Sequence, residues 1–322
     1  MEFEDFILFD AFKKKDKFYL NLSIFKKSLN ETDFLVCINN KILKFYKKIV
    51  NTHKQCPVTI YIYDCDINEP INNYDITYKD IFFFGEFENI AEDNKYDLTL
   101  TTLFKDDYKY FNLFYDYYKK QGIEHFYMYY NGKLNETINN IVKKNDVTLI
   151  SWDFPYRYSK TKKWKKTKEK IIPTWTTISQ FGQMHNALYK YGKNNSKYMI
   201  FCDIDEYLHI PEHTIKSFVL KNDKDYYGFN NVWAKTIEPK DNLNKLPNEF
   251  LVSDKEFNYG SRSKNIYKTN KVTTIGIHKL FEETNQLSKN IKLKLYHFYN
   301  WTNNSARKKE MIDCTNLLKI QY

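Results

Sequence analysis

The segment from Lys197 to Tyr207 constrains the fold of this chain more than any other. Five apolar or aromatic residues, Tyr198 to Cys202, run directly into three carboxylates within four positions, at Asp203, Asp205 and Glu206. Such a run is typical of a buried strand, and carboxylates at its end indicate a polar site at the edge of a sheet. Oxygen ligands at this spacing suit a hard divalent cation, so Asp203 and Asp205 are candidate metal ligands, and Glu206 either joins them or anchors the loop. The alternative is a strand followed by a solvated acidic turn, because the motif is common by chance.

Composition narrows the class of protein. The 322 residues leave room for about two domains. Apolar residues make up 42% of the chain and aromatic residues 18%, which excludes a disordered protein. The formal net charge of +10 is compatible with a polyanionic partner, but only three of the fifty basic residues are arginines, which nucleic-acid readers use for bidentate contacts. The lysine excess is better explained by coding bias in an AT-rich genome, such as that of a large virus, and we expect no nucleic-acid partner.

Targeting signals and cysteine pairs are missing from the sequence. The five cysteines are scattered, with no Cys-x-x-Cys pair, which favours a reducing compartment. The first residues, Met1 to Asp5, lack the basic and apolar regions of a signal peptide. No stretch is long and apolar enough for a membrane span. We therefore expect a cytoplasmic protein, in the host cytoplasm if the source is a virus, and the oligomeric state stays open.

Residues 1–95 alternate apolar and polar side chains in short runs, for example Phe18 to Ile24 and Val58 to Tyr63. This period of two, interrupted by polar turns, predicts a small antiparallel β domain. The domain carries no chemical motif, so its role stays open. Asp64 and Asp66 form a second acidic pair, but a surface turn explains them better, because Asn and Pro follow.

From residue 96 the pattern changes to alternating strands and helices. Three apolar runs have the length of strands: Leu98 to Phe104, Phe126 to Tyr130 and Val147 to Trp152. The segments between them repeat apolar residues at helical spacing. Strands joined in this way run parallel, and their ligands bind beyond the carboxyl ends of the strands, where Asp203 and Asp205 also fall. We therefore expect an α/β domain over residues 96–322, with a Rossmann-like sheet flanked by helices.

A lysine-rich segment precedes the acidic motif. Seven lysines surround Trp164 between Tyr158 and Lys170. Such a run is usually a solvated loop, but it also fits a lid that offsets phosphate charge when a ligand binds. The helix that follows ends at Gly192. Its polar face carries glutamines, and His185 near the margin is more simply explained as a structural residue than as a ligand.

Three blocks of sequence are more specific together than any one of them alone. Residues 179–188 read Ser-Gln-Phe-Gly-Gln-Met-His-Asn-Ala-Leu and precede the acidic segment, and residues 122–131 read Gly-Ile-Glu-His-Phe-Tyr-Met-Tyr-Tyr-Asn. A weaker block joins Lys264, His278 and His297. Together these blocks resemble the glutamine helix, the Asp-x-Asp-Glu motif, the Gly-Val-x-His-Phe strand and the closing histidines of glycosyltransferase family 92 and related GT-A fold enzymes. The resemblance covers roughly residues 97–310.

The resemblance implies a GT-A fold, with a mixed sheet that binds a nucleotide-diphospho-sugar. It implies that Mn²⁺ or Mg²⁺ is held by Asp203, Asp205 and a C-terminal histidine, His297, with His278 in reserve. Such an ion acts as a Lewis acid on the leaving diphosphate. The residues that then qualify for donor binding are Thr101, Asn131, Gln180 and Asp203, and those that qualify for substrate contacts are Glu206, Trp233 and His278.

The acceptor hydroxyl needs a carboxylate base on the opposite face of the sugar if the configuration inverts. Glu238 and Asp254 are candidates because they lie between the acidic motif and the C-terminal histidines, while Asp205 contributes to catalysis through the ion. Trp233 can stack on a sugar face, although burial is the commoner fate of a tryptophan.

The sequence therefore predicts a metal-dependent, inverting glycosyltransferase that moves a hexose from a nucleotide-diphospho-sugar to a glycan or other hydroxyl acceptor. By family analogy the donor is UDP-linked, with UDP-galactose the first candidate, although fold alone does not settle the donor. A noncatalytic carbohydrate-binding or adhesion protein with the same fold is the main alternative. A basic nucleic-acid binder that uses Lys162, Lys163, Lys165 and Lys166 is the other.

Overall fold

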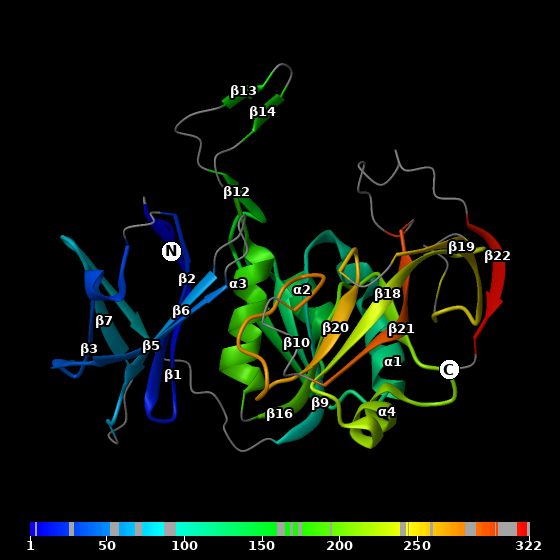
Figure 1. The fold of residues 1–322 in the computed structure, drawn as a ribbon, viewed down its shortest axis with the longest axis horizontal. Coiled ribbons are helices and arrows are strands. Elements are labelled where there is room, and N and C mark those ends of the chain that lie inside the picture. Colours follow the sequence, from blue (N-terminus) through cyan, green and yellow to red (C-terminus); the bar gives the residue numbers. More distant parts are fainter. Residues whose placement is uncertain are drawn as a thin grey trace. The chain divides into compact units, whose positions relative to one another are not determined.

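The fold is that of a computed structural model, and the described chain forms two compact units (Figure 1). The first unit consists of Met1–Asn94, Phe154–Tyr191 and Thr273–Ile275, and the second of Lys95–Asp153, Gly192–Val272 and Gly276–Tyr322. The structure describes residues 1–3, 5–25, 29–51, 58–67, 73–86, 95–159, 165–167, 170–172, 176–193, 195–238, 243, 245–257, 260–280, 288–299, 301 and 314–320.

The N-terminal part of the first unit contains two four-stranded antiparallel sheets, of order β1-β2-β6-β5 and β4-β3-β7-β8. The inward side chains of both sheets form one core, in which the rings of Phe34 and Tyr61 meet edge to face at 5.6 Å. The small, antiparallel N-terminal β region is therefore confirmed, whereas the domain boundary at residue 95 stays a prediction. Its elements are β1 (Phe6–Lys14), β2 (Lys17–Ile24), η1 (Glu31–Asp33), β3 (Phe34–Ile38), β4 (Lys41–Ile42), β5 (Lys44–Asn51), β6 (Val58–Asp64), β7 (Asn73–Tyr78) and β8 (Ile81–Glu86).

The glutamine-bearing helix α3 belongs to the same unit as these sheets and packs against β1 and β2. Asn21 donates from its amide to the carbonyl of Gly182 at 2.8 Å, and Lys14 donates to the carbonyl of Lys190 at 2.8 Å. The lysine charge suits the carboxyl end of a helix. A Cβ at Gly182 would lie 2.4 Å from the ring of Phe9, so the close approach requires glycine. The further elements here are β12 (Arg157–Ser159), β13 (Lys165–Thr167), β14 (Lys170–Ile172), β15 (Thr176–Ile178), α3 (Ser179–Asn186) and the π-helix η3 (Ala187–Gly192).

The second unit is built on a ten-stranded mixed sheet whose main path is β11-β10-β9-β16-β20-β18-β19-β22. Strands β11, β10, β9 and β16 run parallel, as predicted, whereas β20, β18, β19 and β22 pair antiparallel along the path. Strand β21 runs parallel to β18 and antiparallel to β17. The strands are β9 (Tyr96–Phe104), β10 (His125–Tyr130), β11 (Val147–Ser151), β16 (Ser196–Phe201), β17 (Glu206–His209), β18 (Tyr226–Lys235), β19 (Glu249–Phe257), β20 (Lys264–Lys268), β21 (Lys289–Phe298) and β22 (Cys314–Lys319).

Helices α1, α2 and α4 share a hydrophobic core with β9, β10 and β16. The aromatic stripe of α1 provides Phe111, Phe114 and Tyr118, all fully buried. The helix ends at Lys120, two residues before Gly122, whose φ of 90° favours glycine. Among the described residues, no helix has the length and apolar character needed to cross a membrane. The helices are η2 (Asp106–Tyr110), α1 (Phe111–Lys120), α2 (Glu136–Val142) and α4 (Ile215–Asn222).

The parallel strands end at one edge of the sheet. Tyr130 of β10 lies opposite Phe104 of β9, and Phe201 of β16 lies opposite Thr101 of β9. Because parallel strands share their direction, the residues after β16, beginning the acidic run at Asp203, reach the edge at which ligands of such sheets bind.

Candidate active site

The acidic run forms a tight turn between β16 and β17. The amide of Glu206 donates to the carbonyl of Asp203 at 3.1 Å, and the Glu206 carboxylate accepts a hydrogen bond from the Asp203 amide at 2.7 Å. These reciprocal bonds make Glu206 the anchor of the turn. They also fix Asp205, which is only 3% exposed, directly before β17.

Two tyrosines of α1 hold the free edge of β17. The hydroxyl of Tyr118 donates to the carbonyl of Glu206 at 2.9 Å and accepts from the amide of Leu208 at 3.1 Å. The hydroxyl of Tyr117 donates to the carbonyl of Leu208 at 2.6 Å. Since β17 pairs on its other side with β21, both edges of this short strand are hydrogen-bonded. The aromatic stripe of α1 thus positions the acidic residues as well as filling the core.

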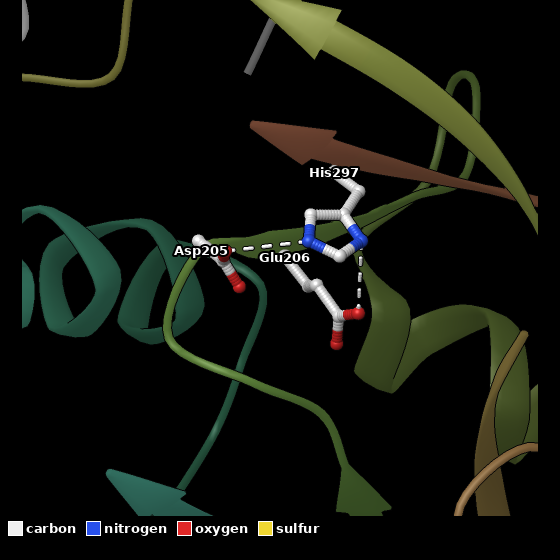
Figure 2. A group of neighbouring side chains, drawn as sticks. All are labelled: Asp205, Glu206 and His297. Atoms are coloured by element: carbon white, nitrogen blue, oxygen red, sulfur yellow. Dashed lines mark ion pairs between the residues drawn. The ribbon is translucent and has the colours of Figure 1, made fainter. Parts of the chain in front are cut away.

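Pairing of β17 with β21 brings His297 against the acidic residues. Glu206 lies opposite His297, and the amide of Phe298 donates to the carbonyl of Asp205 at 2.9 Å. Figure 2 shows the imidazole between the two carboxylates, with Nε2 3.3 Å from Oδ2 of Asp205 and Nδ1 3.3 Å from Oε1 of Glu206. All three side chains are at least 96% buried, so these contacts are shielded from water.

Strand β18 fixes the other sides of the imidazole. The side-chain oxygen of Asn231 lies 3.2 Å from Nδ1 of His297, and the ring of Trp233 lies 4.6 Å from the imidazole ring. Asn231 and Glu206 both present acceptor oxygens to Nδ1, which suits a proton on this nitrogen. Nε2, which faces Asp205, is then the nitrogen that can bind a cation placed between the two side chains.

A buried lysine faces the acidic turn from β20. The ammonium of Lys264 lies 2.7 Å from Oδ2 of Asp203 and 3.3 Å from Oε2 of Glu206, and the lysine is 2% exposed. Two carboxylates around one ammonium offset the cost of burying that charge. Asp203 is thus engaged by Lys264, and its side chain remains 30% exposed at the rim.

Burial and these ion pairs shift the ionisation of the group. Burial raises the pKa of Glu206, and the charges of Lys264 and His297 offset this only in part. Burial is the largest influence on the pKa of Asp203 and acts to raise it, but the charge and hydrogen bond of Lys264, together with the charge of His297, lower the pKa overall. Burial acts to lower the pKa of Lys264, but the neighbouring carboxylates, Asp203 foremost, raise it overall. Lys264 is therefore a cation at neutral pH, paired with an ionised Asp203.

The donor atoms fit a divalent cation. One ligand atom each from Asp205, Glu206 and His297 lie within 4.8 Å of one another. Carboxylate oxygens suit Mg²⁺ and Mn²⁺, and an added imidazole nitrogen favours a transition metal such as Mn²⁺. Of the expected ligands Asp203, Asp205 and His297, the structure brings Asp205 and His297 together and turns Asp203 toward Lys264.

Sequence reasoning did not assign a role to Lys264 or Asn231. Lys264 is one of 47 lysines, fifty basic residues less three arginines, so its residue type carried no signal. Its place in the third family-like block was the available clue. Asn231 lies in an alternating strand of an asparagine-rich chain, where nothing local distinguishes it.

The residues expected to bind the donor lie in different places. Thr101 of β9 donates to the carbonyl of Tyr127 at 3.0 Å, and Asn131 follows β10 and donates to the carbonyl of Trp152 at 3.0 Å. Both lie in the unit that contains the acidic turn, whereas Gln180 lies on α3 in the first unit. Their roles in donor binding stay predictions.

The remaining candidates surround the site at different depths. His278 contacts the carbonyl of Ser263 through Nδ1 at 3.1 Å, and burial, with a smaller effect of Lys264, lowers its pKa to about 4. Trp233 is 2% exposed, so its place in this structure is beside His297. Its role in sugar stacking, like that of His278 in substrate binding, stays a prediction.

Neither candidate base takes part in the ion pairs around His297 that the structure describes. Glu238 is exposed and lines a cavity of about 490 Å³ beyond the end of β18, together with Leu243, Lys245 and Glu249. Asp254 is exposed on β19 and accepts a hydrogen bond from Asn316 of β22. The identity of the base stays a prediction.

The lysine-rich segment lies largely outside the described residues. Lys162 and Lys163 are among those not described, while Lys165 and Lys166 belong to β13, which pairs with β14. The expected lid, and the nucleic-acid contacts of the third hypothesis, stay predictions.

Comparison with protein families decides the class of the chain. The sequence model of glycosyltransferase family 92 matches residues 99–317. This chain belongs to glycosyltransferase family 92. The match spans the acidic turn and His297, so the cluster of Figure 2 lies inside the glycosyltransferase region. No curated protein matches the chain. As a glycosyltransferase it acts on a sugar donor and an acceptor, which favours the enzyme over the two noncatalytic hypotheses.

Proposed function

We propose that this glycosyltransferase transfers a hexose from a UDP-sugar, with UDP-galactose the first to test, to a hydroxyl group of a glycan, with the help of Mn²⁺ or Mg²⁺. The observation that supports this proposal is the buried pair of Asp205 and His297, whose Oδ2 and Nε2 lie 3.3 Å apart. A carboxylate and an imidazole held together at the ligand-binding edge of such a sheet are suitable protein ligands for the ion.

Each residue of the cluster around His297 has its own role in this proposal. The ion, when bound, supplies positive charge that offsets the charge developing on the leaving diphosphate. Asp205 and His297 hold it. Glu206 accepts a hydrogen bond from Nδ1–H of His297 and so orients the ring, an arrangement that raises the basicity of a metal-binding histidine. Asn231 reinforces this orientation from β18.

The stereochemical outcome depends on the face of the sugar from which the acceptor hydroxyl attacks. We propose inversion, with a carboxylate that removes the proton of the attacking hydroxyl from the face opposite the leaving group. Glu238 and Asp254 remain the two candidates. Separate Glu238→Gln and Asp254→Asn variants distinguish them, because loss of the base lowers the rate of transfer while leaving donor binding intact.

The direct test is release of UDP from UDP-galactose, with and without Mn²⁺, by wild type and Asp205→Asn. We expect release to depend on the metal and to fall by about 100-fold in the variant, the cost of removing one preorganised electrostatic contact. Asp223→Asn is the matched control, because Asp223 is an exposed carboxylate of the same unit that pairs with Lys197 and Lys268. Equal rates in wild type and Asp205→Asn, or release unaffected by chelator, would contradict the proposal.

A further inference from the structure

Lys264 is a charged residue at a position where the fold alone would favour an apolar one. Lys264 lies at the start of β20, opposite Phe229 of β18, in the interior of the sheet. A lysine in such a place is costly unless its charge is paired. In the described part of the chain its ion pairs are with Asp203 and Glu206, and Asp205 instead faces His297. Of the three carboxylates in the acidic run, Lys264 therefore pairs with two, Asp203 and Glu206, and does not pair with Asp205.

Both engaged carboxylates are held in fixed positions. Oε2 of Glu206 faces Lys264 at 3.3 Å and the Asp203 amide at 2.7 Å, while Oε1 faces His297 at 3.3 Å. Oδ2 of Asp203 lies 2.7 Å from Lys264. Binding of an ion by one of these oxygens would compete with the charge-assisted hydrogen bonds that the oxygen already accepts, which weakens it as a metal ligand.

The charges in the cluster are consistent with this division. Lys264 places one positive charge beside the carboxyl groups of Asp203 and Glu206, in a cluster that also contains Asp205. This charge reduces the net negative charge around the proposed ion. Without the lysine, the excess negative charge would oppose the approach of a diphosphate.

We propose that Lys264 is a positioning residue that keeps Asp203 and Glu206 off the ion, so that Asp205 and His297 are its protein ligands and further coordination positions are left for diphosphate oxygens. This inference rests on the proposed function. Under this proposal the ion binds without help from Lys264, whereas the diphosphate of the donor needs the positions that Lys264 keeps open. Loss of Lys264 should therefore weaken the binding of UDP but not the binding of Mn²⁺.

Calorimetry on the full chain tests this difference. Mn²⁺ is titrated alone, and UDP is titrated at saturating Mn²⁺, into wild type, Lys264→Met and Lys264→Arg. In Lys264→Met, we expect UDP to bind about tenfold more weakly or worse, because Asp203 and Glu206 are then free to compete with the diphosphate for the ion, while the Kd of Mn²⁺ alone stays within about threefold of wild type or becomes tighter. Lys264→Arg keeps the charge and restores most of the UDP affinity.

Lys268→Met is the matched control. Lys268 lies on the same strand but pairs with the exposed Asp223, so its loss leaves both titrations unchanged. If Lys264→Met does not fold, Lys264→Gln, which keeps a hydrogen-bond donor without the charge, takes its place with the same expectation.

Two outcomes overturn the inference alone: a parallel loss of Mn²⁺ and UDP affinity in the neutral variant, which indicates a merely structural lysine, or unchanged UDP affinity. Failure of the wild-type chain to bind Mn²⁺ and UDP overturns the proposed function and this inference together. The wild-type titrations therefore separate the two claims.

Discussion

The carboxylate of Asp205 and the imidazole of His297 lie 3.3 Å apart on a turn and a strand that are distant in the sequence. Antiparallel pairing of β17 with β21 brings them together, and Glu206 and Asn231 hold the far side of the imidazole. The site is thus assembled by backbone pairing and oriented by side chains of neighbouring strands.

Replacing His297 with Gln removes the nitrogen that faces Asp205. We expect the affinity for Mn²⁺ to fall at least tenfold and metal-dependent release of UDP to fall by about 100-fold. Calorimetry and a UDP-release assay measure the two effects. His213→Gln is the control, because His213 is exposed before α4. A variant at position 297 that matches wild type in both measurements would rule out His297 as a ligand.

Replacing Tyr118 with Phe removes the hydroxyl that bridges Glu206 and Leu208 of β17. The carbonyl and amide left behind are buried, so we expect the free energy of unfolding in urea to fall by about 1–3 kcal/mol. Tyr108→Phe, at a half-buried position on η2, is the control and costs less than about 1 kcal/mol. Equal losses in the two variants would mean that the tyrosine hydroxyl does not hold the strand.

His185 makes stability depend on pH. Its Nδ1 faces the carbonyl of Phe181 at 2.8 Å and its Nε2 accepts from the amide of Ile275 at 3.4 Å, which requires the neutral ring. Burial lowers its pKa to about 4, below the value of about 6.5 in the unfolded chain, so the unfolded state binds more protons between these values. This contribution is complete above about pH 6.5 and is lost as the pH falls toward 4.

His185→Gln isolates this contribution, because glutamine does not titrate. The free energy of unfolding of wild type, relative to that of His185→Gln, should fall by about 2 kcal/mol between pH 6.5 and pH 5. Urea titrations of both proteins at the two pH values measure this difference. An advantage that is the same at both values would show that His185 is not buried in the neutral form.

Replacing Gly182 with Ala tests how closely α3 packs on β1, because the direction of the change in stability depends on that packing. In an exposed helix this change stabilises by up to about 1 kcal/mol, but here the added methyl group would lie 2.4 Å from the ring of Phe9. We therefore expect a loss of about 1–3 kcal/mol from overpacking, seen as a lower melting temperature. A rise in melting temperature would mean that α3 does not pack closely on β1.

Local patterns were sufficient to predict the main elements of the fold. The apolar run before Asp203 predicts β16, the runs ending at Phe104 and Tyr130 predict β9 and β10, and alternation in the first residues predicts antiparallel sheets. These signals are local because each strand must bury its own apolar side chains. The carboxylates at the end of β16 were found for the same reason.

The partners of those carboxylates were harder to predict, because they come from strand pairing at long range. Nothing near Glu206 indicates that it lies opposite His297, and the pairing of Lys264 with Asp203 depends on β20 lying between β16 and β18. His297 was identified only through resemblance to the family. The place of α3 among the N-terminal strands likewise depends on contacts of Asn21 and Lys14 that no local pattern encodes.

The most direct test of the account is the position of the ion. A crystal grown with Mn²⁺ and UDP, with anomalous scattering recorded at the manganese edge, locates the metal independently of activity. We expect one anomalous peak bonded to the Asp205 carboxylate and to Nε2 of His297, with Lys264 still paired to Asp203. A peak elsewhere, or an Asp205 and His297 that remain in direct contact with no metal between them, would contradict the account.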